Sequence, residues 1–224
     1  MKLLDDEHKI YLLDNDNFNF PSLDMMNDDL VAIGGDFHPQ RLINAYKNGL
    51  FPWFIDEYNH IHWYSPQKRM VLYPEEFKVS KSLRRTIKNK NFVVKSNTNF
   101  EEVIKNCSNV KRKHEDETWI DDNFITAYTN LYKLGYAYSI ETYLDEKLVG
   151  GLYGIIINDI FCGESMFSLE KDASKIAFFH LCNQAKQNDI NLIDCQVYNE
   201  HLASLGAREI DRKEYFKLLK NDKA

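Results

Sequence analysis

The stretch Asn191-Leu-Ile-Asp-Cys-Gln-Val-Tyr-Asn199 predicts a short buried strand that carries two polar side chains. Side chains of a strand alternate between its faces. Asp194 and Gln196 are therefore expected to project from the same face, with Cys195 on the other. Burying an unpaired charge is costly, so such groups are usually hydrogen-bonded or face a cleft. The spacing leaves open a buried polar pair that holds a neighbouring loop and a pair that lines a cleft.

The composition is that of a globular protein of one large or two small domains. The chain has 224 residues, of which 44% are hydrophobic and 28% charged. Its formal net charge of -6 excludes simple bulk attraction to nucleic acid, so any such binding requires local clusters of basic residues. The four cysteines include no C-x-x-C pair, which argues against a zinc site and a disulfide framework; they are Cys107, Cys162, Cys182 and Cys195.

The location of the protein is expected to be cytoplasmic. The sequence contains no apolar run long enough to cross a bilayer. Its first residues, Met-Lys-Leu-Leu-Asp-Asp-Glu-His, lack the apolar core of a signal peptide.

The N-terminal part combines an acidic stretch, a strand and a helix. Residues 30–36 predict a strand that runs into a glycine turn, but no phosphate-binding G-x-x-x-x-G-K-[ST] pattern follows Gly34-Gly35. Residues 39–48 predict a helix, since Pro39 suits its first position and Gly49 follows its end.

Two aromatic runs follow this helix, over residues 50–55 and 61–66. They hold five aromatic side chains around two prolines and predict a proline-stiffened loop. Such a cluster is either core or interface, or the wall of an apolar pocket in which Trp53 contacts a substrate. Residues 66–73 are expected to be a link into the second half of the chain.

A basic segment extends from residue 78 to 95, with seven Lys or Arg and no Asp or Glu. Apolar residues recur at helical spacing and predict an amphipathic helix over about residues 80–90. Four cations would crowd its outer face: Lys81, Arg84, Arg85 and Lys88. The pattern fits either a solvated surface or a contact with a phosphate backbone.

The C-terminal half predicts an antiparallel meander followed by a helix and the opening strand. Helices are expected over residues 100–107 and 122–134, strands over 137–143, 148–157 and 160–167, and a long helix over 173–188. This order is typical of an α+β acyltransferase-like sheet.

Several runs of residues then carry a family resemblance. They extend in order from about residue 30 to 210. They are Leu30-Val-Ala-Ile-Gly-Gly-Asp, Ala45-Tyr-x-x-Gly-Leu-Phe-Pro-Trp-Phe, Ser80-Lys-Ser-Leu, Thr118-Trp-Ile, Leu148-Val-Gly-Gly-Leu-Tyr-Gly, Phe161-Cys-Gly-Glu-Ser-Met-Phe, Asp172-Ala-Ser-Lys, and Leu192-Ile-Asp-Cys-Gln-Val through Leu202-Ala-Ser-Leu-Gly-Ala. In these runs the chain resembles the leucyl/phenylalanyl-tRNA–protein transferases.

The resemblance implies a cytoplasmic bacterial aminoacyltransferase. It would move Leu or Phe, and less so Met, from aminoacyl-tRNA to the N-terminal Arg or Lys of proteins, marking them for degradation. It implies an α+β fold, with a small N-terminal α/β domain over residues 1–67. A GNAT (acetyltransferase)-like catalytic domain with a mixed, mostly antiparallel sheet would cover residues 68–224. Metal, ATP and acetyl-CoA would not be needed.

The resemblance also implies roles for individual residues. The positions that match Asp194 and Gln196 are proposed to draw the proton from the attacking amine. Because an amide oxygen is a weak base, we favour a positioning role for Gln196. Glu164 would orient substrate and attract the cationic acceptor. The amino-acid pocket would consist of Trp53, Trp119, Tyr128, Phe161 and Met166. The acceptor stem of the tRNA would bind to Lys81, Arg84, Arg85 and Lys88.

Two departures from the family pattern concern pocket shape and tRNA affinity. Tyr64 stands where many relatives have a second Trp, and Glu117 precedes Thr118 where a Gly is usual.

Two alternatives remain open. An acetyltransferase would require a glycine-rich pyrophosphate loop before the long helix, which Asp172-Ala-Ser-Lys175 lacks. A tRNA- or peptide-binding module without catalysis would keep the basic helix and the pocket, but would not need Asp194, Gln196 and Glu164 together.

Overall fold

The computed structural model describes residues 1–110 and 121–220 and has a mixed α+β fold. The chain forms two compact units, one of Met1–Arg69 with Glu209–Ala224 and the other of Met70–Arg208. The division into functional domains 1–67 and 68–224 remains a prediction. Among the described helices, none combines the length and the apolar character that crossing a membrane requires.

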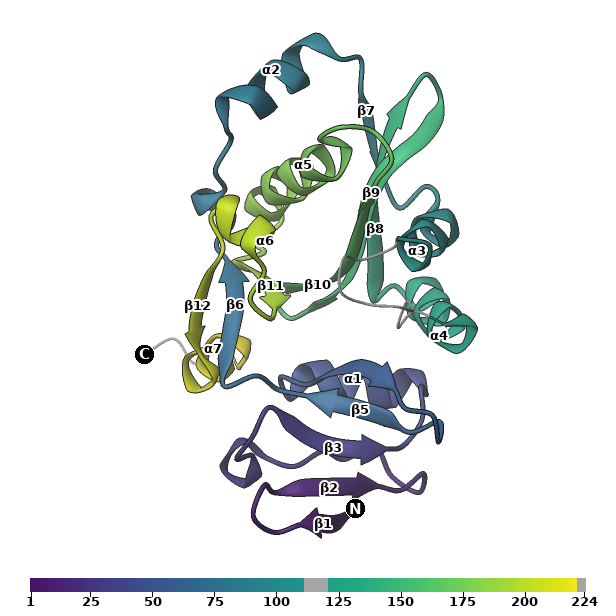
Figure 1. Cartoon of the computed structure of the whole chain (residues 1–224), viewed down its shortest axis with the longest axis vertical. Coiled ribbons are helices and arrows are strands. Elements are labelled where there is room, and N and C mark those ends of the chain that lie inside the picture. The colour runs from purple at the N-terminus through teal and green to yellow at the C-terminus, as the bar shows by residue number, and fades with distance from the viewer. Residues whose placement is uncertain (111–120, 221–224) are drawn as a thin grey trace. The chain divides into compact units, whose positions relative to one another are not determined.

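The first unit contains a five-stranded sheet in the order β1-β2-β3-β5-β4 (Figure 1). Strands β2 and β3 are parallel, and the other neighbours are antiparallel. The strands are β1 (Lys2–Asp5), β2 (Ile10–Leu13), β3 (Leu30–Gly34), β4 (Phe51–Ile55) and β5 (Ile61–Tyr64). The helices are η1 (Leu23–Met25), α1 (Pro39–Lys47) and α7 (Arg212–Leu219). The helix predicted from Pro39 is confirmed.

The aromatic runs form the antiparallel hairpin β4–β5, so the predicted loop was wrong. Proline lacks the N–H that a central strand requires, but β4 lies at the edge of the sheet, where this loss is tolerated. Pro52 pairs with Trp63, and the register shifts between Pro52 and Phe54. Trp63 is fully buried and donates from its indole nitrogen to the Gly34 carbonyl at 2.8 Å. This part of the aromatic cluster is therefore core.

The C-terminal segment joins the first unit through Arg212 of α7. One guanidinium nitrogen of Arg212 donates to the carbonyls of Asp28 (2.8 Å) and Ser65 (2.7 Å). The other donates to the carbonyls of Met26 (3.0 Å) and Asn27 (3.3 Å). The planar guanidinium satisfies several backbone acceptors at once, which ties α7 to the loops of this unit.

A seven-stranded sheet in the order β12-β6-β11-β10-β9-β8-β7 lies mostly in the second unit (Figure 1). Among the pairs of this sheet whose register is described, only β10 and β11 are parallel. The strands are β6 (Lys68–Leu72), β7 (Val93–Ser96), β8 (Ala137–Leu144), β9 (Lys147–Ile157), β10 (Ile160–Ser168), β11 (Leu192–Gln196) and β12 (Arg208–Asp211). The predicted meander and the strand after it are confirmed. The link predicted over residues 66–73 was wrong, because Met70, Val71 and Leu72 are fully buried in β6.

Helices cover both faces of this sheet (Figure 1). The helices of this unit are η2 (Pro74–Glu76), α2 (Lys81–Asn89), α3 (Phe100–Ser108), α4 (Asp122–Lys133), α5 (Ala173–Gln187) and α6 (Glu200–Ser204). Alternation along β9 separates the two cores. Leu152 joins the cluster that includes Phe178 of α5. The next residue, Tyr153, contacts Phe100 of α3 and Tyr128 of α4 edge-on, with centroids 5.7 and 5.9 Å apart.

Glycines in β9 let these layers approach closely. A Cβ on Gly150 would lie 2.5 Å from the Ala173 Cβ at the start of α5. A Cβ on Gly151 would lie 2.7 Å from the Ile140 carbonyl oxygen. Since real Cβ atoms do not approach other atoms so closely, these positions in the Gly-Gly run require glycine for packing.

Gly154→Ala is expected to destabilise the protein by about 1–3 kcal/mol, the usual effect of overpacking a core. A Cβ there would lie 2.3 Å from the Cys162 carbonyl oxygen and 2.7 Å from the Phe161 ring. Gly163→Ala is the matched control, because its Cβ would meet the Asp194 carbonyl at an ordinary 3.5 Å. Chemical denaturation of both variants measures the difference, and equal stability of the two would contradict the packing argument.

Candidate active site

The register of the parallel strands β10 and β11 brings the side chains of Glu164 and Gln196 together. Cys162 of β10 pairs with Asp194 of β11. Two residues further along each strand stand Glu164 and Gln196. Neighbouring strands lie about 4.8 Å apart, a separation that side chains bridge. The Gln196 amide nitrogen donates to Glu164 Oε1 at 2.9 Å.

The backbone at Gln196 is unusual. Its φ is 65°, in the left-handed region that a long side chain rarely occupies. A register shift between Asp194 and Gln196, against β6, marks a β-bulge at this point. Strict alternation, expected from the sequence, is therefore interrupted at Cys195. Bulges and left-handed residues concentrate near functional sites, where they redirect a side chain.

Glu164 is held at both of its carboxylate oxygens. Oε1 accepts the hydrogen bond from Gln196, and Oε2 accepts one from the Tyr128 hydroxyl at 3.0 Å. Glu164 is 8% exposed, and Tyr128 is fully buried. Two donors on a largely desolvated carboxylate fix its orientation. The position of Glu164 is thus determined jointly by α4 and β11.

Asp194 holds the backbone of Gln196 at the bulge. It is fully buried, and its Oδ1 accepts the backbone N–H of Gln196 at 2.9 Å. This hydrogen bond engages a residue in a strained conformation, and a carboxylate acceptor strengthens it. Asp194, Gln196, Glu164 and Tyr128 therefore form one hydrogen-bonded chain. Chemically, the Glu164 carboxylate orients the side-chain amide of Gln196 and the Asp194 carboxylate holds its backbone, an arrangement that suits the binding of a cationic amine.

Two aromatic rings pack against the Tyr128 end of this chain, one stacked and one edge-on. Phe124 stacks on Tyr128 one helical turn away, with ring centroids 4.2 Å apart. Tyr153 meets Tyr128 edge-on, at 5.9 Å and an interplanar angle of 78°. Such pairs stabilise beyond the area that they bury. The ring of Tyr128 therefore has one position, from which its hydroxyl reaches Glu164.

The remaining residues predicted for the pocket differ in their surroundings. Phe161 is 2% exposed and belongs to the core between the sheet and α5. Met166 is partly buried against the same core. Trp53 is partly buried in β4 of the first unit, with its ring 5.0 Å from that of Tyr64. Trp119 lies outside the described residues. Of this set, only Tyr128 has a described contact with Glu164.

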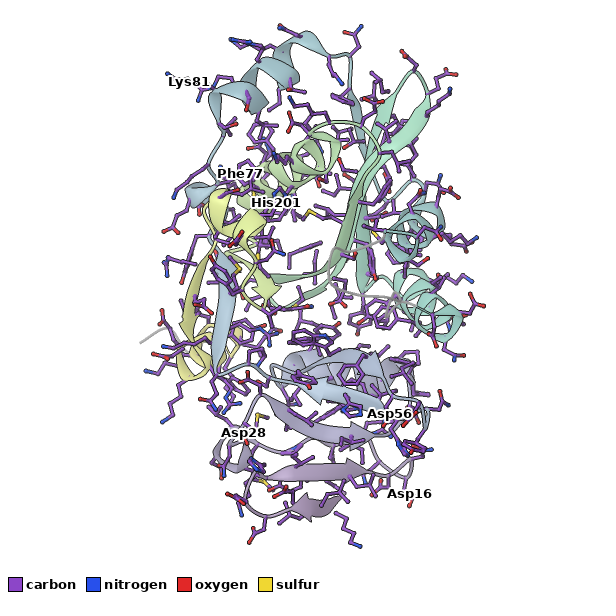
Figure 2. All side chains as sticks on the ribbon, viewed as in Figure 1. Asp16, Asp28, Asp56, Phe77, Lys81 and His201 are labelled. Carbon is purple, nitrogen blue, oxygen red and sulfur yellow. The ribbon has the colours of Figure 1, made fainter. Side chains whose placement is uncertain are left out.

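The predicted basic helix is confirmed as α2. The Ser80 hydroxyl caps it by accepting the Leu83 backbone N–H at 3.1 Å. Leu83 is its one buried residue. All four predicted cations are exposed: Lys81, Arg84, Arg85 and Lys88. Figure 2 labels Lys81 at the start of this helix.

The described residues contain no group of three or more His, Cys, Asp or Glu side chains arranged to hold a metal ion. Cys182 is a buried core residue, and burial raises the pKa of its thiol to about 12. A thiol with so high a pKa stays protonated at neutral pH and is a poor nucleophile or metal ligand.

Sequence reasoning missed two features of this site. The bulge carries none of the glycines that commonly mark one, so only the paired structure reveals it. The hydrogen bond from Tyr128 to Glu164 joins residues 36 positions apart, and no local pattern in the sequence indicates it.

Comparisons with known proteins agree on one family. The chain matches the leucyl/phenylalanyl-tRNA protein transferase family over residues 71–220. It matches the N-terminal domain of these transferases over residues 35–67.

Several similar proteins carry this name in full. The leucyl/phenylalanyl-tRNA–protein transferase of Flavobacterium johnsoniae is 49% identical over 95% of this chain and 100% of its own length. That of Dechloromonas aromatica is 48% identical over 88% of this chain and 85% of its own. That of Flavobacterium psychrophilum is 49% identical over 90% of this chain and 96% of its own.

One solved structure, a protein of unknown function from Bacteroides thetaiotaomicron, has a TM-score of 0.47 at 11% identity. The match covers 62% of this chain and 53% of that one. The likeness is too weak to assign a fold family.

Tyr128→Phe is expected to lower the free energy of unfolding by about 1–3 kcal/mol, because Glu164 loses a donor in a buried site. The ring and its stacking remain. Tyr132→Phe on the same helix is the matched control, since its hydroxyl donates to the Asn97 carbonyl at an exposed position. Urea denaturation should show a larger loss for Tyr128→Phe, and an equal or smaller loss would contradict the importance of its hydrogen bond.

Proposed function

The chain belongs to the leucyl/phenylalanyl-tRNA protein transferase family and is an aminoacyltransferase, and we propose that it modifies the N-termini of proteins. In the proposed reaction, Leu or Phe, and less so Met, leaves aminoacyl-tRNA for an N-terminal Arg or Lys. The observation that carries this proposal is the hydrogen-bonded chain of Tyr128, Glu164, Gln196 and Asp194.

The reaction forms an amide bond and breaks an ester bond. The α-amine of the acceptor attacks the ester carbonyl, and the ribose hydroxyl of the terminal adenosine leaves. An α-amine has a pKa near 8, so a useful fraction is already neutral at pH 7. The ester is activated, and the chemistry therefore gains most from holding the two reactants together.

We assign positioning of the amine to Gln196. Its amide nitrogen donates to Glu164, so the amide oxygen is the atom that we assign to accept a hydrogen bond from the attacking amine. Asp194 fixes the backbone of Gln196 by accepting its N–H. Glu164 adds a negative charge that attracts an acceptor with a cationic side chain and ammonium group. These roles require no cofactor.

The side chain of the transferred amino acid would enter an apolar pocket. We propose that Tyr128, Phe161 and Met166 of the second unit contribute to its lining. Flat rings and a flexible thioether suit Leu or Phe, which are unbranched at Cβ. Exclusion of Ile and Val would be steric and of the order of 10–200-fold, because apolar pockets discriminate methyl groups modestly.

The tRNA would bind along α2. The exposed cations there lie in a chain with a net charge of -6, so they form a local basic surface rather than part of a general one. Contacts to phosphates position a nucleic acid without reading its sequence. Binding at the acceptor stem would therefore tolerate different tRNA sequences.

We propose a cytoplasmic enzyme of protein degradation by the N-end rule, with a GNAT-like catalytic domain over residues 68–224. The meander β8-β9-β10, then α5, then β11 supports that domain type. An acetyl-CoA donor is disfavoured, because the start of α5, Asp172-Ala-Ser-Lys175, lacks the glycine-rich loop that binds a pyrophosphate.

The first test is transfer of radiolabelled Leu from Leu-tRNA to a protein with N-terminal Arg, with N-terminal Ala as control. Label on the Arg protein alone is expected. Tight binding of tRNA without transfer would overturn the proposed enzymatic activity and support a binding module.

Gln196→Gly should lower transfer by about 10²-fold or more, with a loss of stability no larger than the roughly 1–3 kcal/mol expected for Tyr128→Phe, because each variant takes one donor from Glu164. The variant removes the amide, but glycine accepts the left-handed backbone more readily than glutamine. Asp189→Gly is the matched control, since Asp189 is exposed and has a φ of 55°. Full transfer by Gln196→Gly would remove Gln196 from the mechanism, whereas loss in both variants would indicate a general effect of glycine.

Arg84→Gln with Arg85→Gln should weaken tRNA binding by about tenfold or more at physiological salt. The slope of log affinity against log salt should become shallower by about 2, since each phosphate contact releases about one counterion. Lys105→Gln with Lys133→Gln is the control, because it removes the same charge from exposed positions of α3 and α4. Equal effects in both double variants, measured by filter binding, would argue against a site on α2.

A further inference from the structure

The basic helix α2 has few apolar contacts to hold it in place. Leu83 is its one buried residue, and Ile87 is partly buried. Before the helix, Phe77 contacts two rings of α5, with centroids 5.6 Å from Phe178 and 5.9 Å from Phe179 (labelled Phe77 in Figure 2). Apolar packing thus secures the beginning of this segment, and its far half requires another attachment.

That attachment comes from the loop between β10 and α5. Thr86 of α2 donates from its hydroxyl to Asp172 Oδ2 at 3.0 Å. Lys175 of α5 donates to the other oxygen, Oδ1, at 3.2 Å. Past the end of α2, Lys90 pairs with Glu170 at 3.3 Å. Two carboxylates of one short loop therefore bind the second half of the basic helix.

The two attachments differ in strength. The side chains of Lys90 and Glu170 are 39% and 44% exposed, and such surface pairs contribute little. The Asp172 side chain is only 7% exposed, so its hydrogen bonds are shielded from water. Burial by itself raises the pKa of Asp172. The hydrogen bonds from Lys175 and Thr86 lower it, and the pKa lies below its usual value. The carboxylate is therefore ionised at neutral pH and is a strong acceptor.

Asp172 also occupies a special place in the chain. Its φ of 68° is left-handed, a conformation that Asp tolerates better than most residues. It follows β10, which carries Glu164, and immediately precedes α5, which leads into β11 with Asp194 and Gln196. One connection thus carries the catalytic candidates at its two ends and the attachment of α2 between them.

We propose that Asp172 is a positioning residue for the tRNA donor, which it serves by fixing α2 through Thr86. A mobile α2 would still present its cations, but their contacts with successive phosphates would no longer be aligned with the catalytic strands. Ordering the helix before binding removes an entropic cost of binding. This inference rests on the proposed function and adds residues that do not themselves touch the tRNA.

The test compares a complete donor with a truncated one. Thr86→Val removes the hydroxyl but keeps a β-branched side chain, and Asp172→Asn keeps an acceptor oxygen and tolerance of the left-handed backbone. Ser82→Ala is the matched control, because the Ser82 hydroxyl lies on the same helix and contacts Ser80 instead of α5. For each variant, filter binding gives the affinity for Phe-tRNA, and transfer is measured from Phe-tRNA and from phenylalanyl-adenosine, which lacks the acceptor stem.

Thr86→Val should weaken Phe-tRNA binding by about tenfold, as expected for the loss of a hydrogen bond to a charged group. The slope of log affinity for Phe-tRNA against log salt should become shallower in this variant. Transfer from phenylalanyl-adenosine should stay at the wild-type rate, which distinguishes positioning from general damage. Asp172→Asn should show a smaller loss of the same kind, and Ser82→Ala none.

Wild-type affinity of the Thr86→Val variant for Phe-tRNA would overturn the proposal. An equal loss of transfer from Phe-tRNA and from phenylalanyl-adenosine would overturn it too. Wild-type protein that transfers from neither donor would instead refute the proposed function. The binding measurement would still test the attachment of α2 in that case.

Discussion

The parallel pairing of β10 with β11 is the constraint on which the second unit depends. Parallel neighbours cannot be joined by a tight turn and require a crossover, which α5 supplies. The crossover must lie against the sheet, and Gly150 of β9 provides the room at its start. The same pairing sets the register that brings Glu164 opposite Gln196. The shape of the sheet, the packing of α5 and the polar site are therefore consequences of one pairing.

The polar chain at this register is a local exception to the rules that stabilise the rest of the unit. Asp194 is fully buried and Glu164 nearly so, and Gln196 is held in a conformation that favours glycine. Each of these features destabilises a fold unless surrounding contacts compensate. Here the compensation is specific, since the Gln196 N–H binds Asp194 and the stacked Tyr128 binds Glu164. A sequence with no functional demand at this point would be expected to place apolar side chains there.

Local periodicity was enough to predict most helices and the meander of this chain. The helix from Pro39 and the strands of β8 to β10 follow directly from spacing and turn residues. Strand β6 was missed because the apolar run from Met70 to Leu72 is too short to define a period. The burial of this run depends on its pairing with β11, which lies far away in the sequence. Pro52 led to the prediction of a loop. A strand tolerates proline at the edge of a sheet, and the sequence does not show that β4 is an edge strand. The identities of the site residues came from the family resemblance, whereas the bulge at Gln196 and the bond from Tyr128 depend on contacts between distant segments.

An acidic protein that binds a polyanion must control charge over short distances. At physiological salt, charges separated by more than about 8 Å are largely screened. The carboxylates nearest to α2 therefore matter more than the net charge of -6. Glu170 and Asp172 are two such groups, and each is paired with a lysine, Lys90 or Lys175. These pairs reduce the repulsion that the two carboxylates would exert on phosphates, while Asp172 still serves as an acceptor for Thr86. The same loop can thus hold the basic helix without opposing its charge.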